Sequence, residues 1–138
     1  MANAIQFPYT ITNPALGESS ALPYLPLTLT QSQQTVPVTG LVDSGAMVNV
    51  LPYQIGQQLG LVWQQQTVPL KLTGNLARYE ARGVILTAKV GTFAPVRLAF
   101  AWTASDEAPL LLGQTNFMQE FDVCFLRSQL LFEIKPKP

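Results

Sequence analysis

The sequence predicts an all-β domain with one or two short helices. Short segments alternate apolar and polar residues, which is typical of strands with one buried face. Glycine, proline and asparagine separate these segments at short spacing, as turns do between the strands of a β-protein. Hydrophobic residues make up 48% of the 138 residues and charged residues only 12%, which is enough apolar material for the core of one domain.

The first elements of the chain are an arm and two strands. Residues 1–20 are rich in proline, asparagine and glycine, and they predict a loosely ordered arm with at most one short strand. The folded domain follows at residues 21–138. Leucine alternates with proline or threonine in "LPLTLT" (25–30), and "VPVTGLVDSG" (36–45) returns as a second strand after a turn at "QSQQ" (31–34).

The middle of the chain predicts one helix and a hairpin. A short helix is expected in "LPYQIGQQLGL" (51–61), because Pro52 is tolerated in a first helical turn and Gly60 is a typical stop. A hairpin is expected with its tip at "TGNLA" (73–77), which lies between two strand patterns. Three further strands are predicted at residues 67–74, 79–90 and 94–102.

The last part of the chain repeats the strand-to-helix pattern. "LLLG" (110–113) is an apolar strand that ends at Gly113, and a short helix is expected from Thr115. "VCFLRSQLLFEI" (123–134) predicts two strands that turn at "RSQ". Cys124, the single cysteine, excludes an internal disulfide and is expected to be a small core residue.

Charge and composition exclude several function classes. The formal net charge is zero and the basic residues are scattered, so neither nucleic acid nor an anionic membrane surface is an expected partner. No apolar run approaches the roughly 20 residues that span a bilayer. The first 20 residues lack the basic and apolar regions of a signal peptide, which predicts a cytoplasmic location.

The absence of histidine narrows the possible chemistry. It removes the Ser-His-Asp triad, the Cys-His pair and the usual zinc sites. The acidic residues do not have the spacing of a calcium loop, so neither a metal nor a cofactor is expected. Any catalysis must then depend on Asp, Glu, Lys, Tyr or Cys.

Asp43 is the charged residue that needs an explanation. It lies within the apolar stretch "LVDSGAMVNV" (41–50), and a carboxylate held among apolar residues is costly unless it is hydrogen-bonded or functional. The small residues Ser-Gly-Ala after it allow backbone N–H groups to approach the carboxylate. One interpretation is an Asx-turn or a helix cap that merely ends the strand. The other is a functional carboxylate.

The motifs around Asp43 resemble those of a known family. "LVDSGA" (41–46) is similar to the active-site loop of the retropepsin-like aspartic proteases, the single-lobed relatives of pepsin, and "LLLGQTNFMQEFDV" (110–123) is similar to their late strand and helix. The resemblance covers residues 22–134, and bacterial members fit best. It implies a closed β-barrel, the acid-protease half, with a flap hairpin.

The resemblance also implies a role for individual residues. Asp43 would be catalytic, with Ser44, Gly45 and Ala46 as its active-site loop. Leu111, Leu112 and Gly113 would be the supporting strand beneath that loop. The flap, which contacts substrate, would contain Thr73, Gly74, Asn75 and Leu76.

One feature of viral members is missing. They often carry an acid after the loop alanine and an arginine after the late glycine, which pair within one subunit. Here those positions hold Met47 and Gln114, so this ion pair cannot form.

The mechanism implied by the resemblance needs two carboxylates, and the chain has one Asp-Ser-Gly. An aspartic endopeptidase acting on polypeptides must therefore be a homodimer. Residues 130–138 and the arm are candidates for interface strands, unless they pair within one subunit. The alternative function is a catalytically silent peptide-binding or dimerisation module. A serine hydrolase using Ser44 is disfavoured because no histidine is present.

Overall fold

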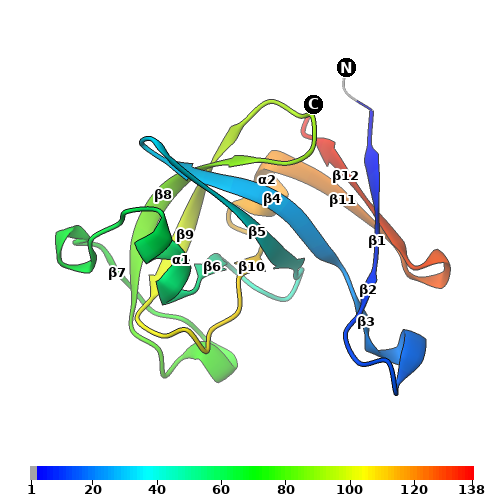
Figure 1. The fold of residues 1–138 in the computed structure, drawn as a ribbon, viewed down its shortest axis with the longest axis horizontal. Helices are drawn as coiled ribbons and strands as arrows, with labels where there is room; N and C mark the ends of the chain where they lie inside the picture. The colour runs from blue at the N-terminus through cyan, green and yellow to red at the C-terminus, as the bar shows by residue number, and fades with distance from the viewer. Residues whose placement is uncertain (1–2) are drawn as a thin grey trace.

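The computed structural model describes residues 3–138, and its centre is a closed β-barrel (Figure 1). The strands pair in the order β4-β5-β10-β6-β9-β8, and β8 pairs back onto β4. This closure confirms the predicted all-β barrel. The barrel strands are β4 (Tyr24–Gln31), β5 (Gln34–Val42), β6 (Asn49–Leu51), β8 (Ala81–Lys89), β9 (Val96–Thr103) and β10 (Leu111–Leu112).

The barrel closes around apolar side chains that the strand alternation directs inward. Leu25, Leu27 and Leu29 of β4 are buried, whereas the residues between them face outward. On β9, Trp102 is fully buried and stacks on the ring of Tyr53. Burying side chains of this size contributes about 1.5–3 kcal/mol each, so the barrel interior is the main source of stability.

The two short helices lie where the glycine and proline signals predict them. Helix α1 (Tyr53–Gln58) begins directly after Pro52, and Gly60 beyond it has a φ of +81°. Helix α2 (Phe117–Glu120) follows β10. No helix within residues 3–138 is long and apolar enough to cross a membrane.

The chain ends form a second sheet beside the barrel, at the right in Figure 1. Its order is β1 (Ile5–Pro8), β12 (Leu131–Pro136) and β11 (Phe121–Leu126), all antiparallel. The turn between β11 and β12 is η4 (Arg127–Gln129), as predicted at "RSQ".

This sheet corrects two expectations about the chain. The arm is not loosely ordered, because β1 pairs with β12 and β2 (Thr10–Ile11) pairs with β3 (Ala21–Leu22); the single turn η1 (Gly17–Ser20) joins the last two. Cys124 is exposed rather than in the core, because it lies on the outward face of β11. The pairing of β1 with β12 also shows that both tails pair within the chain.

The predicted hairpin differs most from the structure. Of the strand expected at 67–74, only β7 (Pro69–Leu70) forms and pairs with β8, and loop 71–80 replaces the rest of it and the tip expected at 73–77. The loop contains one 3-10 turn, η3 (Gly74–Leu76), and a similar turn, η2 (Trp63–Gln65), precedes β7. The physical reason is packing. Leu76 and Tyr79 are three residues apart and would lie on opposite faces of a strand, but with the 3-10 turn between β7 and β8 both pack on the apolar cluster that contains buried Leu72.

Candidate active site

Asp43 is the first residue beyond the end of β5. Strand β10 runs parallel to β5, and the Asp43 N–H donates to the carbonyl of Leu112 at 3.0 Å. The partly buried carboxylate accepts a hydrogen bond from the Gly45 N–H at 2.9 Å. The Asx-turn that one interpretation of the sequence predicts is thus present. Its hydrogen bond restricts the Asp43 side chain and holds the carboxylate in place.

The residues after Asp43 are held against the segment that follows β10. The N–H of Gln114 donates to the carbonyl of Ala46, and the N–H of Thr115 donates to that of Met47, each at 2.9 Å. Gly113 lies so close that a Cβ there would be 2.6 Å from the Ala46 carbonyl oxygen. The predicted supporting residues therefore do lie directly beside the loop.

Gln114 occupies the position at which the family resemblance places the arginine of viral members. Its side-chain amide donates to the carbonyl of Ser44 at 2.8 Å. Met47, at the position of the paired acid, is 65% exposed. A neutral hydrogen bond thus supports the loop where the resemblance indicated only a missing ion pair.

Asn49 is a buried residue of the site that sequence reasoning missed. It is fully buried; its amide donates to the carbonyl of Ala99 at 2.9 Å, and its oxygen accepts from the N–H of Gly113 at 2.8 Å. Asn49 thereby joins β6, β9 and the end of β10. The available signal was a polar residue inside the apolar segment "VNV", which is the same signal that singles out Asp43.

Replacing Asn49 by alanine should lower the free energy of unfolding by about 2 kcal/mol, because the buried N–H of Gly113 and carbonyl of Ala99 lose their partner. Urea unfolding measures this change. The matched control is Asn75→Ala on exposed loop 71–80, expected within about 0.5 kcal/mol of the wild type. Equal unfolding midpoints for both variants would contradict the assigned role of Asn49.

A cavity of about 440 Å³ opens beside Asp43. Its walls come from the Asp43 loop, from loop 71–80 and from the start of β10. Among the predicted site residues, those that line it are Asp43, Gly45, Ala46, Thr73, Gly74, Asn75, Leu76 and Leu111. Ser44 is exposed outside the lining, and Leu112 and Gly113 are buried behind it. The fold therefore brings the predicted catalytic loop and the predicted flap residues to one cavity.

The lining of the cavity is mostly apolar. Its charged side chains are those of Asp43 and Lys71. Beneath it lies a cluster of small and branched side chains, on which Leu76 and Tyr79 of loop 71–80 also pack. The buried members are Val50, Leu72, Ala81, Ala101, Ala108 and Leu111. Such a surface suits an extended apolar segment of a ligand.

The acidic chemistry available at the cavity is that of one carboxylate. Asp43 offers a single carboxylate to the cavity, and no other acid lines it within residues 3–138. Across the same described residues, no group of three or more His, Cys, Asp or Glu side chains is placed to hold a metal ion.

Comparisons with known proteins identify a family and a fold. A sequence profile described as "Aspartyl protease" matches residues 25–115, from β4 to the segment just beyond Gly113. In fold, the chain is similar to the crystal structure of a retropepsin-like aspartic protease from Rickettsia conorii, with a TM-score of 0.63 and 16% sequence identity. That similarity covers 96% of this chain and 91% of the other. No curated protein matched the sequence.

Proposed function

The chain belongs to the aspartyl protease family, and on that premise we propose that it is an aspartic endopeptidase active as a homodimer. The observation that carries the proposal is the placement of Asp43. One fixed carboxylate faces an apolar cavity, and no second acid among residues 3–138 lines it. A second copy, related by a two-fold axis, supplies the missing carboxylate.

The proposed reaction uses the two copies of Asp43 with one shared proton and one water. The ionised carboxylate takes a proton from the water, whose oxygen attacks the peptide carbonyl carbon. The protonated carboxylate hydrogen-bonds to the carbonyl oxygen and stabilises the negative charge that develops there. Collapse of the tetrahedral intermediate breaks the C–N bond, and the leaving amine takes a proton from the pair.

The surrounding residues suit this reaction. The Gly45 N–H holds the Asp43 carboxylate, and the exposed Ser44 hydroxyl is available to a partner subunit. Loop 71–80 takes the role of the flap, with Thr73, Gly74, Asn75 and Leu76 against the substrate. Because the lining is mostly apolar, the favoured substrates carry apolar side chains next to the cleaved bond.

The dimer we propose extends the terminal sheet. Within residues 3–138, β12 is paired along both edges, whereas β1 and β11 are each paired along one. The C-terminal strand is therefore not the free edge that the sequence suggested. The edge of β11 is the longer of the two that remain. In the chain, β10 is followed by α2, and β11 begins directly after α2. Antiparallel pairing of β11 with its own copy would make one continuous sheet.

The test of this function is cleavage of an unstructured protein from about pH 3 to about pH 8, where the rate should peak on the acid side because the pair must keep one proton. A pepstatin-type inhibitor should abolish the cleavage. No cleavage at any pH by a folded dimer that still binds apolar peptides would instead identify the silent peptide-binding module.

Replacing Gln114 by alanine should lower kcat/KM by about threefold to tenfold, because the loop that carries Asp43 loses its side-chain support and small misplacements of reacting groups are costly. The same change should lower the free energy of unfolding by no more than about 1 kcal/mol. The matched control is Gln119→Ala, at the exposed position of α2, which should retain the wild-type kcat/KM. Equal kcat/KM for both variants would show that the Gln114 bond does not support the loop.

A further inference from the structure

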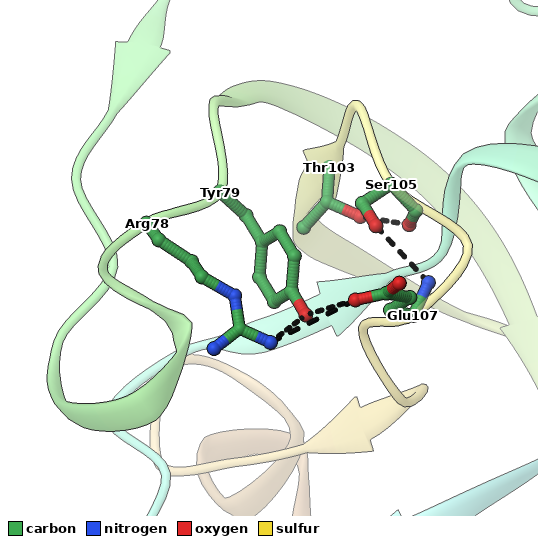
Figure 2. Close-up of polar contacts among 5 residues, drawn as sticks. All are labelled: Arg78, Tyr79, Thr103, Ser105 and Glu107. Atoms are coloured by element: carbon green, nitrogen blue, oxygen red, sulfur yellow. Dashed lines mark hydrogen bonds and ion pairs between the residues drawn. The ribbon is translucent and has the colours of Figure 1, made fainter.

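Three polar side chains connect loop 71–80 to the loop between β9 and β10. Arg78 Nη2 donates to the hydroxyl of Tyr79 at 2.7 Å, and that hydroxyl donates to Glu107 Oε2 at 3.2 Å. The same Arg78 nitrogen lies 3.7 Å from Glu107 Oε2, and the guanidinium sits over the Tyr79 ring. Figure 2 shows the three side chains converging from the two loops. We call this set the clasp.

Glu107 is a fixed end of the clasp because its own loop is tied to the barrel. The N–H of Glu107 donates to the hydroxyl of Ser105, and the Thr103 hydroxyl donates to the carbonyl of Ser105 (Figure 2). On the other side, Asp106 accepts a bond from the N–H of Gln54 in α1. Ala108 is buried in the cluster beneath the cavity. Glu107 therefore projects from a backbone with little freedom.

Loop 71–80 depends on side chains for its position. Its return end is held at backbone level, where Ala81 pairs with Thr103 and the Ala104 N–H donates to the carbonyl of Glu80. The other backbone hydrogen bonds of the loop join loop residues to one another. The clasp is the polar connection from the loop to the segment between β9 and β10. Along the chain, the clasp residues Arg78 and Tyr79 lie between the end fixed at Ala81 and the segment 71–76, which lines the cavity beside Asp43.

We propose that Arg78, Tyr79 and Glu107 are positioning residues that hold loop 71–80 in its substrate-binding arrangement before substrate arrives. This proposal rests on the proposed function, since it names what orders the flap of that enzyme. A loop already in place loses less conformational freedom when substrate binds, so affinity is higher than for a free loop. None of the three side chains touches the reacting atoms.

The experiment compares Glu107→Ala and Tyr79→Phe with the wild type in peptide cleavage and in amide hydrogen exchange. Loss of exposed bonds of this kind weakens substrate affinity by at most about fivefold. We therefore expect KM to rise by about threefold to fivefold, while kcat stays within about twofold of the wild-type value. A merely destabilised enzyme would lose kcat and keep its KM. Exchange of the amides in 71–80 should speed up by a similar factor.

The matched control is Glu80→Ala. Its carboxylate is also exposed and lies 3.6 Å from Arg82, but it is not part of the clasp, so its KM should equal that of the wild type. Unchanged KM and exchange in both clasp variants, or an equal rise in Glu80→Ala, would overturn the proposal. If the wild type cleaves nothing, the proposed function fails, and exchange of loop 71–80 still decides whether the clasp holds it.

Discussion

The Asp43→Asn variant is expected to fold and dimerise like the wild type but to cleave peptide bonds at least about 10³-fold more slowly, because an amide neither takes a proton from water nor shares one with its twin. The fold should persist, since the amide oxygen can still accept the Gly45 N–H bond that the carboxylate accepts at 2.9 Å. Initial cleavage rates at the acidic optimum, with unfolding and sedimentation measured on the same sample, test both halves of this expectation.

The control for that variant is Glu18→Gln. It makes the same carboxylate-to-amide change on an exposed residue of η1, far along the chain from Asp43, and it should cleave at the wild-type rate. Retained cleavage in a folded Asp43→Asn dimer would contradict the assignment of Asp43 as the catalytic residue. Loss of cleavage in both variants would point to a general charge effect instead.

Replacing Gly113 by alanine should be the most damaging change of a single methyl group at the site. The new Cβ would lie 2.6 Å from the Ala46 carbonyl oxygen and 2.7 Å from that of Val48. Both are backbone atoms and cannot rotate away, so the loop after Asp43 must shift. Overpacking of this kind destabilises by about 1–3 kcal/mol, and we expect the upper end of that range together with a loss of most cleavage activity.

Gly83→Ala is the matched control for this prediction. Gly83 lies in β8, where an added Cβ would meet Leu70 and Val68 at an ordinary 3.6 Å. It should be neutral or slightly stabilising, because alanine reduces the freedom of the unfolded chain. Differential scanning calorimetry of the two variants measures the difference in their stability. A Gly113→Ala protein as stable and as active as Gly83→Ala would show that the loop can move aside freely.

Individual strands and the first helix were predictable because their signals are local, whereas the closed barrel was implied by the family resemblance. The leucines of β4 repeat with a period of two, and Pro52 and Gly60 bracket α1 within one short segment. The Asp43 loop and the strand ending at Gly113 were predictable in a different way, from a resemblance to the aspartyl protease family, to which the chain belongs. Their parallel pairing places the two motifs side by side.

The remaining features depend on contacts between distant segments. Strand β1 pairs with β12 at the other end of the chain, and the side chain of Gln6 bonds to that of Glu133. Because this partner is so distant, nothing near the arm in sequence indicates that β1 pairs at all. Loop 71–80 carries the residues of a hairpin, but packing of both Leu76 and Tyr79 on the cluster beneath the cavity overrides its strand pattern. The support from Gln114 is equally remote, because its partner Ser44 lies in the other half of the chain.

The most direct test of the shared site is a subunit-mixing experiment. Wild-type and Asp43→Asn chains are unfolded together in equal amounts, refolded, and assayed for cleavage at fixed total concentration. If each site needs Asp43 from both chains, only wild-type pairs are active and the rate should fall to about a quarter of that of the wild type alone. A rate of about half would mean that each chain works by itself, and would contradict the homodimeric active site.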